Sequence, residues 1–185
     1  DLDNPKFQGA KVNTAFDATT NSLNLTGAGQ FDNIADLDAV GSLDDVGGIS
    51  PSGTYDFAST LDLGAVFSLD LIRHFKTEGF FPSDLFDARP QGFPTTGTFD
   101  GTEANDVDAQ LFVRTTQDDP SGSPTYTAFQ NFTSGTFKAR GFQFRTVLTS
   151  NDPAQDIRVF QLGYTAKLEQ RTDQGTGQTI TSSAG

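Results

Sequence analysis

The chain of 185 residues has no cysteine, no methionine and no tryptophan, and its only histidine is His74. Without cysteine, neither a disulfide framework nor a thiolate metal site can form. The missing methionine at position 1 favours a piece of a longer polypeptide. His74 stands within a predicted strand, and the sequence has no Gly-x-Ser-x-Gly motif. A surface or edge histidine is therefore favoured over a member of a catalytic triad.

Basic residues are scarce, with 12 Lys and Arg against 24 Asp and Glu and a net charge of −12. Nucleic-acid binding needs a basic surface, and binding to anionic lipid needs a polybasic patch. No apolar run approaches the ~18 residues of a membrane helix. We therefore expect neither nucleic acid as a partner nor membrane insertion. Divalent cations and neutral or basic partners remain compatible with this charge.

Apolar and polar residues alternate through the second half of the chain with the period of two that a half-buried strand requires. The alternating segments are 107–115, 142–148 and 160–168, with a further strand expected at 126–132. Turn-forming residues separate them, at 118–122 and at 150–153. These patterns predict four consecutive strands.

Upstream, apolar spacing predicts short strands near 55–57 and 61–64 and a long one at 65–76, where a slip at Leu71-Ile72 indicates a bulge. About eight strands with long connections fit an all-β fold. We expect an antiparallel two-sheet sandwich or jelly roll of the galactose-binding-like type.

The domain organisation follows from composition. Residues 51–170 are expected to form the β-sandwich domain, and 171–185, rich in Thr, Gln, Gly and Ser, a linker to a further domain. Residues 1–50 are predicted to form an irregular acidic extension. Within this extension, the sequence also allows short strands at 11–16 and 22–26. Its hydrophobic residues are spaced too widely for a core of their own, so we expect support from the sandwich or from neighbouring copies.

Oxygen-bearing side chains concentrate just before the first of the four strands. Carboxylates are the ligands that calcium prefers, although the spacing here is not that of an EF-hand. The candidate ligands of one structural calcium ion are Asp100, Glu103, Asp106 and Asp108. The acidic segment 32–45 is a second candidate place, and solvated turn aspartates are the alternative in both. We expect no other cofactor and no catalytic residues.

Phenylalanine is abundant, with 18 residues against three tyrosines. Platforms that stack on sugars are usually Trp or Tyr, because an amphipathic ring suits a wet site. Most of these rings should therefore be core residues. The connection 77–105 carries a separate group, and four of its members are predicted to lie at an interface with other copies of the chain: Phe80, Phe81, Phe86 and Phe93.

Several short motifs follow one another in a set order after the aspartate-rich stretch. They are GTYDF at 53–57, LDLGAV at 61–66, DLFDARP at 84–90, FDG at 99–101, DAQLFVRTT at 108–116, DDPSGSP at 118–124, ARGFQFR at 139–145 and DIRV at 156–159. In this order, over residues 30–185, the chain resembles the C-terminal part of siphophage tail-tip attachment proteins, the host-specificity or protein J family. No binding residue of that family can be mapped onto this chain.

The resemblance implies an extracellular virion component at the distal end of a phage tail, without enzymatic activity. It implies a homotrimer that contacts other tail proteins and a glycan or protein of the host surface. Two alternatives stay open. One is a carbohydrate-binding module of a secreted bacterial enzyme with the same fold, and the other is a structural spacer that binds nothing.

Overall fold

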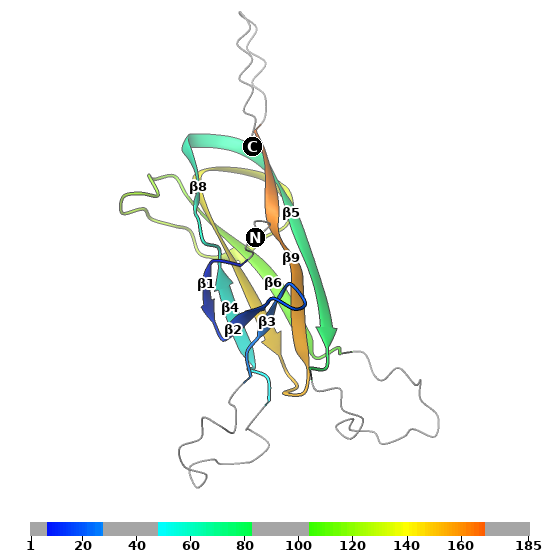
Figure 1. The fold of residues 1–185 in the computed structure, drawn as a ribbon. Coiled ribbons are helices and arrows are strands. Elements are labelled where there is room, and N and C mark those ends of the chain that lie inside the picture. The colour runs from blue at the N-terminus through cyan, green and yellow to red at the C-terminus, as the bar shows by residue number, and fades with distance from the viewer. Residues whose placement is uncertain (1–6, 28–47, 83–103, 169–185) are drawn as a thin grey trace, which may run out of the picture.

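The computed structural model describes residues 7–27, 48–82 and 104–168, and these residues form nine antiparallel strands and no helix (Figure 1). An all-β antiparallel fold is therefore confirmed for this part of the chain. It contains no helix that could cross a membrane. The acidic segment 32–45 and the predicted linker 171–185 lie outside the described residues.

The strands fall into two groups along the chain. Five precede residue 83: β1 (Ala10–Val12), β2 (Thr14–Asp17), β3 (Ser22–Leu25), β4 (Ser52–Asp56) and β5 (Leu61–Phe80). Four follow residue 103: β6 (Val107–Thr116), β7 (Gln130–Asn131), β8 (Gly135–Ser150) and β9 (Asp156–Leu168). The four consecutive strands predicted for the second half are present, but the second is shorter than the expected 126–132.

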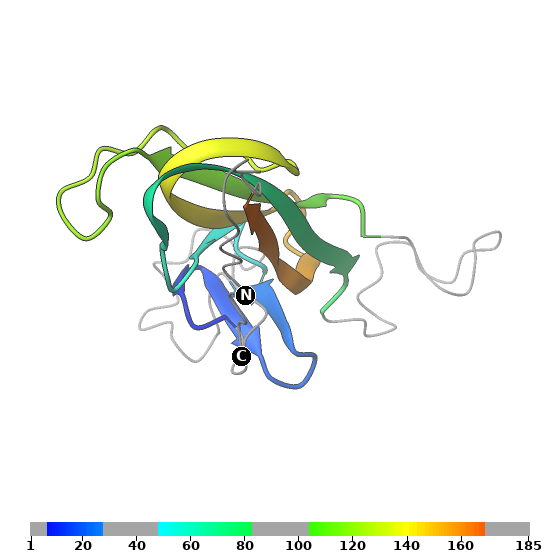
Figure 2. The same ribbon diagram turned by 90° about the horizontal axis from the view of Figure 1, so that it is seen from above.

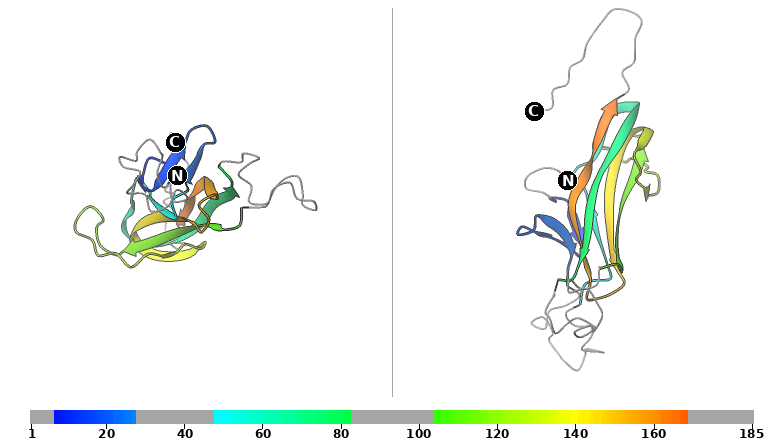
Figure 3. Two further views of the ribbon diagram at one scale, coloured as in Figure 1. Left: turned by 90° about the horizontal axis from the view of Figure 1, so that it is seen from below. Right: turned by 90° about the vertical axis from the view of Figure 1, so that its right-hand side faces the viewer.

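Backbone pairing joins all nine strands into one sheet, where the sequence had predicted two. The order along it is β1-β4-β8-β5-β9-β3-β2, and β6 pairs with the other edge of β8 and carries β7. Figures 2 and 3 show the sheet curling around a shared interior. The result is a nearly closed, barrel-like sheet.

The two ends of this strand order belong to one stretch of chain, because only Asn13 separates β1 from β2. Asn13 has a φ of 52°, a left-handed conformation that asparagine tolerates better than most residues. Its backbone oxygen accepts a hydrogen bond from the Thr26 nitrogen at 3.0 Å, and its side-chain amide donates to the Ser52 oxygen at 3.3 Å. This kink lets one stretch pair with β4 on one side and with β3 on the other.

Part of the N-terminal segment is thus integral to the sheet rather than irregular. β2 and β3 form a hairpin close to the short strands anticipated at 11–16 and 22–26. Phe7, Leu23 and Leu25 are buried in the core of the same chain. Of the two supports that we expected, the sandwich or neighbouring copies, these three side chains use the first, because they pack into the core of their own chain.

The predicted inward faces are largely confirmed in β6 and β8. Leu111 and Val113 are buried, as are Phe142, Phe144 and Leu148. Aromatic rings run through the interior, and among the described residues the shortest centroid distance is 4.3 Å, between the stacked rings of Phe144 and Tyr164. Of the phenylalanines in the described strands, Phe142 and Phe144 are buried, and three more are partly buried against the core: Phe16, Phe75 and Phe137. The expectation that most of the rings are core residues is therefore met only in part, since Phe67 is exposed.

Two bulges differ from the sequence expectation. Leu71 and Ile72 pair regularly with β9, and the register of β5 shifts instead between Asp62 and Phe67 and between Lys76 and Thr77. The first shift contains Gly64 at a φ of 75°, which glycine adopts without steric cost.

The second shift reverses the alternation of β9. Lys76 pairs with Gln161 but Thr77 pairs with Val159, so Phe160 has no partner opposite it on β5. Val159 and Leu162 are both fully buried, whereas Phe160 is partly exposed. The alternation predicted for residues 160–168 would place Phe160 on the same apolar face as Leu162. This prediction is wrong, because the additional residue of the bulge moves the side chains before it to the other face.

Candidate functional site

The acidic residues proposed as calcium ligands are only partly described. Asp100 and Glu103 lie outside the described residues. Asp106 and Asp108 are exposed, and each carboxylate accepts a hydrogen bond from a side-chain amide, from Gln155 at 3.4 Å and from Gln110 at 2.7 Å. In the described ranges no three potential metal ligands come together. The calcium site stays a prediction.

The phenylalanines proposed for an interface are likewise divided. Phe86 and Phe93 lie outside the described residues. Phe80 is the last residue of β5 and lies 3.5 Å, from ring centroid to guanidinium carbon, beneath Arg158. Phe81 follows it and is partly buried. Phe80 thus has a partner within its own chain, and the interface between copies stays a prediction.

His74 lies on β5 and is partly exposed. Its Nε2 is 2.8 Å from the Thr165 hydroxyl on the neighbouring β9. This position agrees with the prediction that His74 is a surface or edge histidine.

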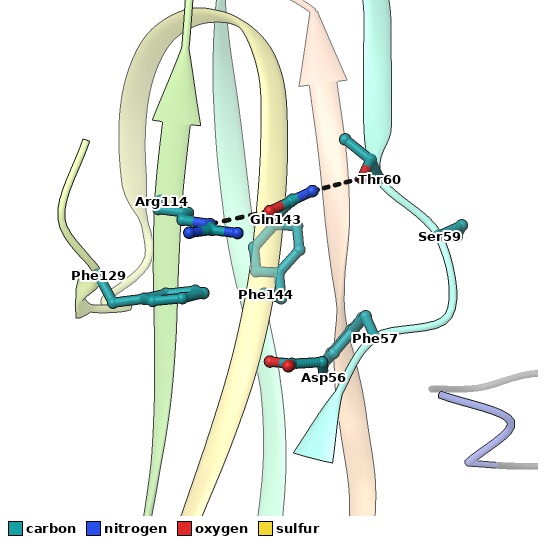
Figure 4. Close-up of a pocket in the computed structure, with 8 residues that line it drawn as sticks. All are labelled: Asp56, Phe57, Ser59, Thr60, Arg114, Phe129, Gln143 and Phe144. Carbon is teal, nitrogen blue, oxygen red and sulfur yellow. Dashed lines mark hydrogen bonds between the residues drawn. The ribbon is translucent and has the colours of Figure 1, made fainter. Parts of the chain in front are cut away.

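A small pocket of about 190 Å³ lies where one edge of β8 passes from β4 to β5 (Figure 4). The last pair of β4 with β8 is Asp56 opposite Arg145, and the first pair of β5 is Leu61 opposite Phe142. Residues 57–60 connect the two strands. The Phe57 nitrogen still donates to the Phe144 oxygen at 3.1 Å, and the rest of the connection forms no strand pair with β8. The lining residues are Asp56, Phe57, Ser59, Thr60, Arg114, Phe129, Gln143 and Phe144.

Polar side chains cross this site from β6 to the β4–β5 connection. Arg114 and Gln143 are directly opposite one another on β6 and β8, on the side of the sheet away from the core. The Arg114 Nε donates to the Gln143 Oε1 at 2.8 Å, and the Gln143 Nε2 donates to the Thr60 hydroxyl at 3.0 Å (Figure 4). This chain of hydrogen bonds fixes the orientation of both amide and guanidinium groups.

Aromatic rings hold the two arginines in place. The guanidinium carbons of Arg114 and Arg145 each lie 4.6 Å from the Phe129 centroid. The Arg114 guanidinium is also 4.7 Å from the Tyr126 centroid. Contacts of this kind contribute about 0.5–1 kcal/mol at exposed sites and more when desolvated. We call the set Tyr126, Arg114, Phe129 and Arg145 the arginine–aromatic column.

The two arginines differ in charge balance. Arg145 donates to both carboxylate oxygens of Asp56, at 2.6 and 2.8 Å, and these hydrogen bonds raise the pKa of Arg145. Arg114 has no such carboxylate partner among the described residues, and only its Nε donates to a protein acceptor there. Its two terminal NH₂ groups are therefore available to a ligand.

The segment 117–129, which carries both rings of the column, is tied to the sheet at several points. The Thr116 hydroxyl donates to the Thr125 oxygen at 2.8 Å, and the Thr127 nitrogen donates to the Thr115 oxygen at 2.9 Å. Arg140 on β8 contacts both Asp62 at 3.1 Å and Asp119 at 2.8 Å. The rings are thus presented by an anchored segment over rigid strands.

The alternation predicted for residues 107–115 and 142–148 places Arg114, Gln143 and Arg145 on the polar side of their strands, but it assigns them no role. Their cooperation depends on the register between β6 and β8 and on the return of Phe129 over the sheet. Neither can be read from spacing along the chain, and the outward alternation of Arg114 and Arg145 was the only signal.

One buried carboxylate lies outside this pocket. Asp156, at the start of β9, is 3 % exposed, and its Oδ1 accepts hydrogen bonds from the backbone nitrogens of Leu25 and Ile157. Burial raises the pKa of Asp156 to about 6. Since β3 pairs with β9 at Leu23 and Val159, this carboxylate reinforces a short contact between the hairpin and β9.

Comparison with known proteins gives no further assignment, because no family model, no curated protein and no solved structure matches the chain.

Proposed function

We propose that this chain is a non-enzymatic virion module of a phage tail tip or tail fibre, which serves host-surface attachment or tail-tip assembly. In this proposal it acts outside the cell, as a homotrimer, with other tail proteins and a host glycan or protein as partners. The short motifs between residues 53 and 159 follow one another along the sequence in the order that resembles tail-tip attachment proteins. This resemblance supports the proposal. The closer description of the fold as a galactose-binding-like jelly roll belongs to the same proposal.

The observation that carries a binding role is the pocket beside the arginine–aromatic column. Its side chains come from three strands and two connections, and hydrogen bonds and ring contacts fix Arg114 and Gln143 before any ligand arrives. Pre-organisation of this kind reduces the entropy lost on binding, and so favours affinity. Arg114 retains unused donors while its neighbours are paired. This arrangement suits recognition.

The alternative function is a carbohydrate-binding module of a secreted bacterial enzyme. The polar pocket favours it, because polar groups that fix orientation are a feature of small-molecule sites. The state of Phe129 counts against it. A sugar platform needs a free aromatic face, whereas this ring already contacts two guanidinium groups.

Two measurements on the intact chain separate these functions. Fluorescently labelled protein is incubated with a panel of bacterial cells and with insoluble polysaccharides, and its mass is determined by sedimentation. A trimer that binds cells supports the tail module. A monomer that binds polysaccharide supports the alternative, and a monomer that binds neither overturns both. The exposed Lys138→Ala variant, outside the pocket, is the matched control and should behave like the wild type.

A further inference from the structure

We propose that the pocket beside Arg114 binds a carboxylate group of an acidic sugar. This inference rests on the proposed function, since it names the chemical class of the surface component that the module would recognise.

The first argument is the geometry of the Arg114 donors. Its Nε is engaged by Gln143, and rings lie at 4.7 Å and 4.6 Å from its guanidinium carbon. The terminal NH₂ groups are free of protein acceptors in the described part of the chain and lie at the pocket. A planar guanidinium with two parallel donors matches the two oxygens of a carboxylate.

The second argument is that the guanidinium is already held in place. A long arginine side chain normally loses rotamer freedom when it grips a ligand. Here Gln143 fixes Arg114 and is itself fixed by Thr60. Binding therefore costs less ordering than at an exposed arginine such as Arg73 on β5, whose guanidinium lies 5.4 Å from the Phe75 centroid.

The third argument concerns size and charge. At about 190 Å³ the pocket lies below the roughly 300 Å³ at which pockets for whole drug-sized ligands begin. It therefore suits one charged group of a larger molecule. The net charge of −12 opposes anions at long range, but physiological salt screens exposed charges beyond about 8 Å.

Local groups decide between a carboxylate and a phosphate. The Asp56 carboxylate lines the same pocket, and its charge is balanced by Arg145. A second negative charge on the ligand would face Asp56 without a further cation, which favours a singly charged carboxylate. The Thr60 and Ser59 hydroxyls in the lining can hydrogen-bond to sugar hydroxyls.

The test is a titration of the intact chain, followed by NMR of the arginine Nε–H signals. The probes are sodium glucuronate, the neutral methyl glucoside as its uncharged match, and inorganic phosphate. Glucuronate should shift the Arg114 signal with a dissociation constant on the order of 1 mM and leave the Arg73 signal in place. Arg114→Lys should weaken binding at least ~10-fold, because an ammonium cannot form the paired hydrogen bonds. Arg73→Lys is the matched control.

Several results would overturn the inference. They are binding of phosphate without glucuronate, equal binding of methyl glucoside, equal affinity in Arg114→Lys, and no shift at Arg114 with any probe. If Arg114→Lys fails to fold, which thermal unfolding reveals, the wild-type signals alone still decide. Failure here is distinguishable from failure of the proposed function, since cell binding by a trimer is measured separately and would then use another surface.

Discussion

Asp56 and Arg145 are directly opposite one another on β4 and β8, and two hydrogen bonds of 2.6 and 2.8 Å join their side chains. Both are about one-third exposed, so water weakens their attraction. We expect a double-mutant cycle with Asp56→Ala and Arg145→Ala to give a coupling free energy of about 1 kcal/mol or less. Urea unfolding of the four proteins measures it, and a coupling above about 2 kcal/mol would mean that the pair acts as a buried one.

Phe144→Ala should strongly destabilise the protein. The side chain is 2 % exposed and stacks on Tyr164 with centroids 4.3 Å apart. Replacing a core phenylalanine by alanine typically costs about 3–5 kcal/mol. The control is Phe160→Ala, at the partly exposed bulge of β9, which should cost clearly less. Equal denaturation midpoints for the two variants would contradict this assignment of faces.

The contribution of Asp156 to the stability of the protein should fall as the pH rises from about 4 to 6. Burial raises the folded-state pKa of Asp156 from 3.8 to about 6, so the folded protein binds this proton more tightly than the unfolded chain does. The contribution is fully present below 3.8 and is lost as the pH passes 6. It amounts to roughly 3 kcal/mol at most, since one pKa unit corresponds to about 1.4 kcal/mol.

Asp156→Asn should remove this part of the pH dependence, because the amide stays neutral while its oxygen can still accept from Leu25 and Ile157. The exposed Asp108→Asn is the control and should keep the wild-type slope. Urea midpoints between pH 3.5 and 7 provide the measurement. An unchanged slope in Asp156→Asn would show that Asp156 titrates normally.

Asn13→Val should destabilise the barrel-like sheet by about 1–2 kcal/mol, because a β-branched residue is strained at a φ of 52°. Asn13→Gly, which accepts this backbone conformation, should cost less although it also loses the hydrogen bond to the Ser52 oxygen. Thermal unfolding compares the two variants. If Asn13→Gly were the less stable, the side-chain hydrogen bond would matter more than the backbone conformation.

The fold class and the later strands could be predicted because their signal is local. Leu111, Val113 and Phe144 alternate with polar residues along their own strands, and burial of one face requires this. The exception was Phe160, where a bulge placed one additional residue in β9. A bulge depends on the partner strand, so the sequence of β9 alone does not reveal it.

The candidate site could not be predicted, because its parts meet only through pairing between distant strands. Arg114 and Gln143 are 29 residues apart, and Gln143 and Thr60 are 83 apart. The same reason explains the first strands. β1 and β2 are short and weakly patterned, and they become strands because β4 and β3 offer them backbone partners.

The closure at Asn13 has a consequence for how the protein is made. The strands β1 to β3 leave the ribosome before the rest of this sheet, yet the Leu25 nitrogen donates to Asp156, which is 131 residues further along the chain. The first strands therefore wait for the last strand before the sheet can close. Contacts between distant residues slow folding, and unpaired strand edges invite aggregation in the meantime. During synthesis, β3 therefore stays without its β9 partner until Asp156 and Val159 have emerged.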